Sequence, residues 1–185
     1  VGGSFASCMT IYESGNTAKQ AIFLALEAEA MKRSLRILDL ACGDGHLWSG
    51  FLPAHPNVSV VGVDTDASVI KRGQMRQEGR LELRVFDAQK CLQDEVFDIV
   101  VAFSAIEHVV DRPAFLSTVW NALRGGGYAY LNYDASHFRS HDLKERLMVP
   151  MSQLLARLGI EGPYMKRVED ELFLEQAKAQ GFIIK

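Results

Sequence analysis

The sequence predicts a three-layer α/β fold in which a mostly parallel central sheet lies between two layers of helices. Three observations lead to this prediction. Short apolar segments alternate with amphipathic segments along most of the chain. Several apolar segments are nearly continuous, as in strands that are buried on both faces of a parallel sheet. Glycines or acidic residues directly follow several of these segments, and the alternation itself is typical of strand–helix repeats with right-handed crossovers.

The length of 185 residues fits one domain. We expect a single domain over residues 1–185, with a core at about 35–133 and an acceptor or lid segment at about 134–167. A net charge of −3 disfavours a surface that binds nucleic acid through bulk positive charge. No apolar run approaches the roughly 20 residues of a membrane span, so we expect no membrane partner either.

The cysteine count disfavours both a disulfide framework and a metal site. Cys8, Cys42 and Cys91 are too few and too scattered for either. The first residues also lack the basic start and apolar stretch of a signal peptide. We therefore expect reduced thiols that fill space, no bound metal and a cytoplasmic location.

The first two elements are a helix and a strand. Thr17–Lys32 contains strong helix formers without Gly or Pro. Its apolar positions Ile22, Leu26 and Ala30 recur every four residues and give the helix one face to bury. Leu35–Leu40 is a short apolar run that predicts the first strand.

A short helix, a second strand and a second long helix are predicted next. His46–Leu52 reads as a short helix before two prolines. Val58–Val63 is β-branched and almost continuously apolar, which predicts a strand buried on both faces. Asp66 or Ser68 is suited to cap the helix that follows, which we expect to run to about residue 78.

The next part of the chain predicts three strands and a helix. Leu81–Phe86 and Phe97–Phe103 are the third and fourth strands. Pro113–Leu123 is predicted as a helix with its proline in the first turn, and Gly125–Gly127 is expected to end it. Tyr128–Tyr133 is the fifth strand.

The last third of the chain is less regular. Ser136–Arg167 is rich in Arg, Lys, His and Met, and we expect a helix at Leu143–Leu158 between irregular pieces. Glu169–Gln180 is predicted as a helix closed by Gly181. Phe182–Lys185 reads as the beginning of a further strand.

Residues with binding chemistry follow four of the predicted strands. In an open parallel sheet, ligands bind beyond the carboxyl ends of the strands. Gly43 and Gly45 allow a tight turn and a close approach of a ligand to the backbone. Asp64 lies 21 residues beyond Gly43, where an acidic side chain would hold a ribose diol. The pattern predicts a nucleoside-binding site.

The charge of the glycine turn indicates which nucleoside it accepts. The dinucleotide fingerprint is G-x-G-x-x-G, but here Trp48 stands at the third glycine position. Asp44 lies inside the turn and Asp39 just before it. Negative charge suits an amino group or a sulfonium better than a pyrophosphate. The turn therefore disfavours NAD and favours S-adenosylmethionine.

Four segments resemble the motifs of the class I S-adenosylmethionine-dependent methyltransferases, which have a Rossmann-like fold. Ile37–Gly45 resembles the first motif, D/E-x-G-x-G-x-G, with Ala41 at the usual first glycine. Val60–Asp64 resembles the second strand of that family. Phe97–His108 resembles the fourth strand with its following loop, and Arg124–Tyr128 resembles the turn before the fifth.

The resemblance implies a cofactor site and an activity. It implies that S-adenosyl-L-methionine is bound by Asp39, Ala41, Gly43, Gly45, Asp64, Thr65, Asp87, Ala88, Phe103 and Ser104. It also implies methyl transfer, and the absence of an Asn-Pro-Pro-Tyr motif leaves a small molecule as the expected acceptor. Candidates for a general base are His108, Tyr133 and His137, followed by Asp134 and His141.

The family fold has seven strands, so we expect the intact protein to continue beyond Lys185 with strands six and seven truncated here. An exposed sheet edge would follow, with lower stability or a homodimer through that edge. Phe5–Thr17, with Tyr12, is expected to close over the cofactor. Alternatives are a non-catalytic cofactor-binding protein, an NAD(P)-dependent oxidoreductase and an enzyme that transfers an aminopropyl group.

Overall fold

The computed structural model describes residues 6–12, 16–75, 79–90, 96–133, 150–151, 154–155 and 168–185. The predicted helix Leu143–Leu158 therefore lies largely outside the described residues, as do His137 and Cys91. Among the described residues, no helix is both long enough and apolar enough to cross a membrane.

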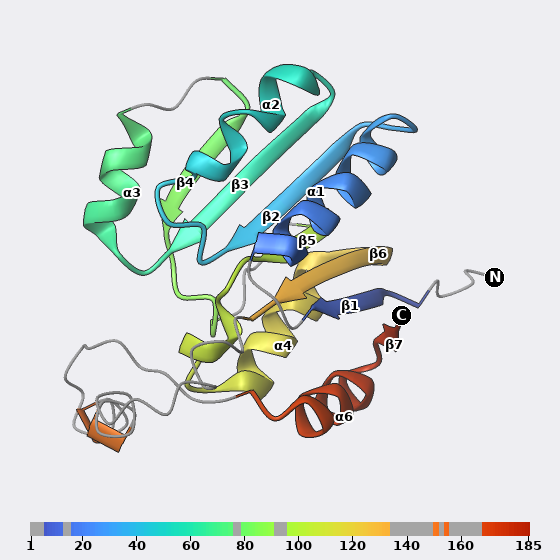
Figure 1. Ribbon diagram of the computed structural model, residues 1–185, viewed down its shortest axis with the longest axis vertical. Helices are drawn as coiled ribbons and strands as arrows, with labels where there is room; N and C mark the ends of the chain where they lie inside the picture. Colours follow the sequence, from blue (N-terminus) through green and yellow to red (C-terminus); the bar gives the residue numbers. More distant parts are fainter. Residues whose placement is uncertain are drawn as a thin grey trace.

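The elements follow the predicted alternation closely (Figure 1). The strands and helices are β1 (Cys8–Tyr12), α1 (Asn16–Ala30), β2 (Leu35–Leu40), η1 (His46–Trp48), α2 (Phe51–Ala54), β3 (Val58–Asp64), α3 (Ala67–Gln74), β4 (Leu81–Val85), β5 (Phe97–Ala102), η2 (Ile106–His108), α4 (Arg112–Ala122), β6 (Leu123–Asn132), α6 (Asp170–Gln180) and β7 (Ile183–Ile184). The predicted α/β fold with a parallel sheet is confirmed.

The described strands form one seven-stranded sheet in the order β4-β3-β2-β5-β6-β1-β7. The pairs β2–β3, β2–β5, β3–β4, β5–β6, β1–β6 and β1–β7 are all parallel. The chain moves outward from β2 to β4 and then returns to the other side of β2 with β5. The carboxyl ends of β2 and β5 therefore adjoin at the point where the strand order reverses, which is where ligands bind in such sheets.

The amino-terminal strand β1 was not predicted, and it corrects two expectations. Cys8–Tyr12 pairs with β6 from Cys8↔Tyr128 to Tyr12↔Asn132, and β7 pairs with its other side. The sheet edge expected beside the fifth predicted strand is thus occupied within the described residues. Tyr12 lies in a strand rather than in a segment that closes over the cofactor, and its carbonyl accepts a hydrogen bond from the Tyr133 amide at 3.2 Å.

Two hydrophobic layers cover the sheet, one on each face. On one face α1, η1, α2 and α3 bury Ile22, Trp48 and Ile70 against β2, β3 and β4. On the other face α4 and α6 pack Phe115 and Phe173 against the opposite side of the strands. Figure 1 shows α4 and α6 together in the lower half of the view, away from α1. This is the three-layer arrangement that the sequence predicts.

The start of β6 differs from the sequence prediction. Helix α4 ends at Ala122, and the strand begins at once with Leu123, so the three glycines at 125–127 lie within β6 rather than ending the helix. The pairing with β5 is irregular between Phe97 and Ile99, which indicates a bulge at this point. Glycine is unfavourable in a regular strand but is compatible with an irregular one. The prediction treated the glycines as the end of the helix, and it therefore placed the boundary between helix and strand too late in the sequence.

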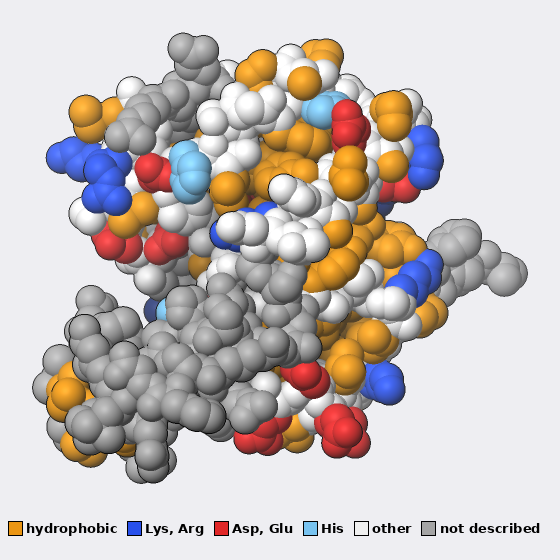
Figure 2. Space-filling view, viewed as in Figure 1, with side chains coloured by type: hydrophobic (Ala, Val, Ile, Leu, Met, Phe, Trp, Pro, Cys, Tyr) orange, Lys and Arg blue, Asp and Glu red, His pale blue; other side chains and the backbone are white. Residues whose placement is uncertain are grey.

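Part of the α1 face of the sheet carries aromatic side chains. Tyr128 and Tyr130 of β6 stack with ring centroids 5.7 Å apart and pack with the cluster that contains α1. Hydrophobic side chains gather at the surface over β6 and β1, to the right of the centre in Figure 2. The expected homodimer stays a prediction.

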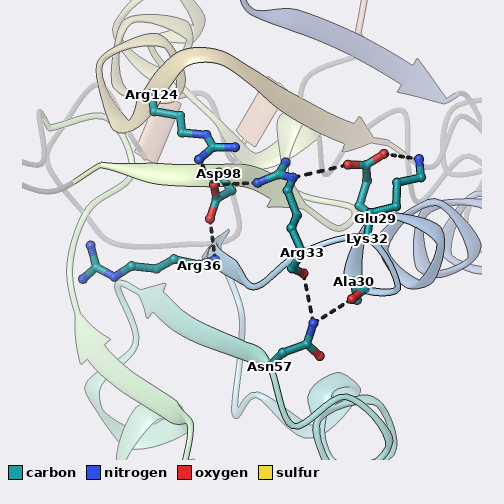
Figure 3. Close-up of polar contacts among 8 residues, drawn as sticks. All are labelled: Glu29, Ala30, Lys32, Arg33, Arg36, Asn57, Asp98 and Arg124. Carbon is teal, nitrogen blue, oxygen red and sulfur yellow. Dashed lines mark hydrogen bonds and ion pairs between the residues drawn. The ribbon is translucent and has the colours of Figure 1, made fainter.

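A polar network fixes the amino-terminal edge of the sheet, at the end opposite the candidate site (Figure 3). Asp98 of β5 binds Arg33 Nη1 at 2.7 Å and Arg124 Nη1 at 2.6 Å through Oδ1. Its Oδ2 accepts a hydrogen bond from the Arg36 amide at 2.7 Å. Asn57 donates to the carbonyls of Ala30 and Arg33 at 2.6 and 2.9 Å, which ties β3 to the end of α1. This network aligns the central strands that position the site.

Candidate functional site

The glycine turn after β2 is built from left-handed backbone conformations. Gly43 and Gly45 have φ values of 58° and 71°, which glycine adopts without steric cost. Ala41 also has a positive φ of 60°. A left-handed alanine costs about 1–2 kcal/mol, so the surrounding packing must impose this geometry. Ala41 thus has a backbone conformation that glycine adopts more easily, and glycine is the usual residue at this position of the methyltransferase motif.

Asp39 is a fully buried carboxyl group with one oxygen unused. Its Oδ2 accepts a 2.7 Å hydrogen bond from Trp48 Nε1, whereas Oδ1 has no hydrogen-bond partner among the described residues. Burial raises the pKa of Asp39 to about 7. The hydrogen bond from Trp48 lowers this pKa, the negative charge of Asp64 raises it, and the positive charge of Lys19 lowers it. A buried unpaired acceptor is costly, so this site is suited to a ligand that donates a hydrogen bond or carries positive charge.

Asp64 connects the end of β3 to the glycine turn. Its Oδ2 accepts a hydrogen bond from the Gly43 amide at 2.9 Å, and its Oδ1 accepts one from the Asp66 amide at 3.0 Å. Of the two caps that the sequence predicts, Asp66 and Ser68, it is Asp66 that caps α3, through the amides of Ser68 and Val69. The carboxylate of Asp64 is half-buried, so it lies next to the turn and stays accessible.

One pocket of about 360 Å³ brings part of the predicted site together. Of the ten cofactor residues predicted from the resemblance, Asp39, Ala41, Gly43 and Phe103 line it, and Lys19 of α1 and Arg72 of α3 add two cationic side chains. Gly45, Asp64, Thr65, Asp87, Ala88 and Ser104 are not among its lining residues.

A larger pocket of about 550 Å³ lies on the other side of the glycine turn and shares Asp44 and His46 with the first. Its polar lining includes Arg80, but the guanidinium is already hydrogen-bonded to the carbonyls of Leu52, His55 and Val58 at 2.6–2.8 Å. The smaller pocket is the better candidate site because it contains the buried carboxyl group of Asp39.

An aromatic cluster attaches α1 to the pocket wall. Phe103 stacks on Phe23 of α1, with ring centroids 5.5 Å apart and an interplanar angle of 10°. Phe23 also contacts Trp48 and Phe51, with centroids 5.5 and 5.4 Å away. Aromatic pairs of this kind are worth about 0.5–1.5 kcal/mol beyond their burial. The cluster therefore holds α1, the Asp39 partner Trp48 and the pocket residue Phe103 in one packed unit.

The loop after β5 is fixed by Asn132, which was not among the site residues predicted from the sequence. Ser104 has a positive φ of 51°, and its amide donates to Asn132 Oδ1 at 3.0 Å. Asn132 is fully buried at the end of β6. An asparagine at the end of an otherwise apolar strand was the signal available in the sequence, because a buried amide needs a specific partner.

Asp87 and Ala88, two of the predicted cofactor residues, lie beyond β4 but outside the pocket. Asp87 Oδ1 accepts hydrogen bonds from the Gln89 amide and side chain at 2.9 and 3.2 Å. The Phe86 amide donates to the Asp64 carbonyl at 2.9 Å, so the end of β4 lies beside that of β3. Asp87 and Ala88 thus follow the strand next to Asp64, as expected from topology, while Thr65 is exposed.

Of the candidate general bases, His108 and Tyr133 lie in the described part of the chain, and they lie in different places. His108 is exposed at the end of η2. Tyr133 is buried at the end of β6, where its hydroxyl contacts the Asp170 carboxylate and lines a separate pocket of about 180 Å³. His137, like Asp134 and His141, lies outside the described residues.

Two of the three cysteines lie in the described part of the chain. Cys8 and Cys42 are buried free thiols, and burial raises the pKa of Cys42, so this thiol stays protonated. Within the described part of the chain, no three His, Cys, Asp or Glu residues are grouped so that they could hold a metal ion.

Gly73 of α3 is a further structural requirement of the turn. A Cβ at this position would lie 2.4 Å from the Asp44 carbonyl oxygen and 2.4 Å from a Leu83 methyl carbon. We expect Gly73→Ala to lower the free energy of unfolding by about 1–3 kcal/mol through overpacking, even though alanine favours helix. Urea unfolding checks this, with Gly50→Ala as the control because nothing lies within 4 Å of its added Cβ. Equal stability of the two variants would contradict the close-packing argument.

Comparisons with known proteins agree with this fold. Residues 38–129 match the family described as "Methyltransferase domain". The chain is similar to trans-aconitate 2-methyltransferase from Deinococcus radiodurans, with 26% identity over 55% of this chain and 39% of that protein. It is also similar to the mitochondrial ubiquinone biosynthesis O-methyltransferase of Homo sapiens, with 31% identity over 52% of this chain and 28% of that protein. The matches thus span less than half of the length of either relative.

Solved structures show the same fold. The YcgJ protein from Bacillus subtilis superposes with a TM-score of 0.59 and 20% identity, covering 86% of this chain and 68% of that one. An S-adenosylmethionine-dependent methyltransferase from Mesorhizobium loti gives a TM-score of 0.51 and 26% identity, covering 62% and 53%.

The sheet order, the glycine turn and the buried carboxyl group together define a methyltransferase domain with a Rossmann-like fold. The chain belongs to the class I S-adenosylmethionine-dependent methyltransferases.

Proposed function

We propose that this chain binds S-adenosylmethionine in the pocket at the end of β2 and transfers its methyl group to a small-molecule acceptor. The observation that carries the proposal is Asp39, whose buried Oδ1 has no hydrogen-bond partner among the described residues and lies in a pocket beside the glycine turn. An ammonium group would donate a hydrogen bond to this oxygen and would place a positive charge beside it. Both the hydrogen bond and the charge would stabilise the ionised form of Asp39.

The other residues fit the remaining parts of the same ligand. Asp64 has its carboxylate beside the turn, where it would accept hydrogen bonds from ribose hydroxyls. Ala41 and Gly43 leave room for the ligand at the backbone, and Phe103 forms an apolar wall. We assign Asp87 and Ala88 to the adenine end and Gly45, Thr65 and Ser104 to supporting backbone contacts, in line with the resemblance.

When bound, S-adenosylmethionine supplies a methyl group that is already activated by the positive sulfur. The chain's own residues then have to orient the donor and the acceptor and exclude water, which is catalysis by proximity. A general base is required only if the acceptor loses a proton, and His108, Tyr133 and His137 stay candidates for that role.

The relatives support a small-molecule acceptor. They are named for trans-aconitate and for ubiquinone biosynthesis, and a further fold relative is an amino pentose methyltransferase from Micromonospora echinaspora. We place the acceptor next to the loop that follows β5, since that loop lies between the cofactor pocket and the end of β6. A cytoplasmic location and a homodimer also belong to this proposal.

Calorimetric titration with S-adenosylmethionine, S-adenosylhomocysteine and NADH tests the proposal. We expect the first two to bind and NADH not to bind, because the acidic turn repels a pyrophosphate. Binding of NADH alone would instead support the oxidoreductase alternative. A cofactor that binds but is never turned over with any acceptor would support the non-catalytic alternative.

A further inference from the structure

Gln89 lies in the turn after β4, two residues beyond Asp87, and it was not among the site residues predicted from the sequence. Both polar atoms of its side chain make hydrogen bonds. Oε1 accepts from the Asp111 amide at 2.7 Å, and Nε2 donates to Asp87 Oδ1 at 3.2 Å. The side chain therefore connects the turn after β4 to the residue that caps the amino end of α4.

The backbone partner fixes which way the amide group of Gln89 faces. A backbone N–H can only donate, so the Gln89 atom that faces the Asp111 amide must be the oxygen. The nitrogen is then directed at Asp87, whose carboxylate is a suitable acceptor. A glutamate here would bring a second negative charge to Asp87, so the position suits a glutamine.

Two hydrogen bonds hold the carboxylate of Asp87 through the same oxygen atom. Oδ1 accepts from the backbone amide of Gln89 at 2.9 Å and from Gln89 Nε2 at 3.2 Å. None of the residues that the structure describes donates a hydrogen bond to Oδ2. The carboxylate is thus held in one orientation, and one of its oxygens stays available to a ligand.

Helix α4 supports this turn from behind. The Asp111 side chain caps α4 by accepting from the Ala114 amide at 3.0 Å, while the backbone amide of Asp111 donates to Gln89. Thr118 of the same helix is buried, and its hydroxyl donates to the Lys90 carbonyl at 3.0 Å. The position of the turn is therefore set by a helix that packs on the sheet, and Gln89 transmits that position to Asp87.

We infer that Gln89 is a positioning residue that determines base selectivity by holding the Asp87 carboxylate toward the 6-amino group of adenine, an inference that rests on the proposed function. The 6-amino group donates a hydrogen bond, which Asp87 Oδ2 accepts. Hypoxanthine carries an oxygen acceptor at the same position, so a carboxylate fixed there disfavours it. Gln89 acts through Asp87 and not by touching the base.

The test compares two ligands that differ only in the base: S-adenosylhomocysteine, with adenine, and S-inosylhomocysteine, with hypoxanthine. The proteins are the wild type, Gln89→Met, Asp87→Asn, the double variant and the control Gln74→Met. Gln74 is a matched glutamine, because its Nε2 donates to the Leu83 carbonyl of β4 at 2.8 Å instead of to Asp87. Calorimetry gives each dissociation constant, and thermal unfolding checks that the variants are folded.

We expect the wild type to prefer the adenine ligand by about 30- to 100-fold, the contribution of one charge-assisted hydrogen bond. Gln89→Met should reduce this ratio by about three- to tenfold, Asp87→Asn should abolish it and Gln74→Met should keep it. The double variant should match Asp87→Asn, because the two residues act as one unit. A change that only loosens the fold would weaken both ligands equally and leave the ratio intact.

Three results would overturn the inference. One is an unchanged ratio in Gln89→Met. Another is an effect of Gln89→Met that persists in full when Asp87 is already asparagine, since Gln89 would then act without Asp87. The third is a wild type that binds both ligands equally tightly, which would leave cofactor binding in place but remove the role of Asp87. A wild type that binds neither ligand would refute the proposed function, and the inference with it.

Discussion

Replacing Asp64 by alanine should weaken S-adenosylhomocysteine binding by on the order of 100-fold, because two hydrogen bonds from the ribose diol to a carboxylate are lost. The side chain also accepts from the Gly43 and Asp66 amides, so we expect a smaller loss of unfolding free energy from the turn itself. Calorimetric titration gives the affinity, and urea unfolding gives the stability of the same variant.

Two controls separate the ribose contact from damage to the turn. Asp66→Ala removes the exposed N-cap of α3 two residues away, which should cost about 1 kcal/mol of stability and leave affinity unchanged. A 2′-deoxy analogue of S-adenosylhomocysteine should bind the wild type more weakly than the parent ligand, and this difference should largely vanish in Asp64→Ala. Unchanged affinity in Asp64→Ala would show that the ribose role is wrong.

The strands of the core and the ends of several helices could be predicted from the sequence alone. Val58–Val63 is apolar throughout, and a strand buried on both faces leaves little freedom for another interpretation. Asp66, one of the two caps predicted for α3, and Gly181, predicted to close α6, do end these helices, since both use local backbone chemistry. Asp39 and Gly43 meet in one pocket because they flank the same turn.

Features that depend on distant partners were missed. Strand β1 has only five residues, and it pairs with β6 more than 100 residues later and with β7 at the other end of the chain. Parallel pairing depends on strands that are distant in the sequence, and the local sequence of β1 does not show which strands these are. Trp48 and Asn132 act through hydrogen bonds with other elements, so their residue types gave only weak signals. Roles at the adenine end and at the acceptor stay predictions.

The buried carboxyl group of Asp39 should make stability fall as the pH rises. Its pKa is about 7 in the folded chain against the usual 3.8, so between about pH 4 and pH 7 the folded state holds a proton that the unfolded state has lost. The free energy of unfolding therefore decreases as the pH rises, and a pKa shift of this size corresponds to a loss of on the order of 4 kcal/mol. Asp39→Asn should remove this decline, so it should be more stable than the wild type at pH 8 but not at pH 4.

Urea unfolding at several pH values measures the decline directly. Asp66→Asn is the matched control, because local hydrogen bonds lower the pKa of the exposed Asp66 and it does not titrate in this window. A wild type whose stability relative to Asp39→Asn is constant from pH 4 to pH 8 would contradict the raised pKa.

The same proton should couple to ligand binding. An ammonium at Oδ1 favours the ionised carboxyl group, so a wild-type chain below pH 7 must release a proton when it binds S-adenosylhomocysteine. Affinity should therefore fall up to about tenfold for each pH unit below 7, and Asp39→Asn should bind more weakly at pH 8 without this decline. Calorimetry in buffers of different ionisation enthalpy counts the released proton. As the pH rises toward 7, the stability of the free chain should fall because burial favours the neutral acid, whereas the affinity should rise because the ligand favours the anion. The same pKa near 7 must therefore account for both pH dependences.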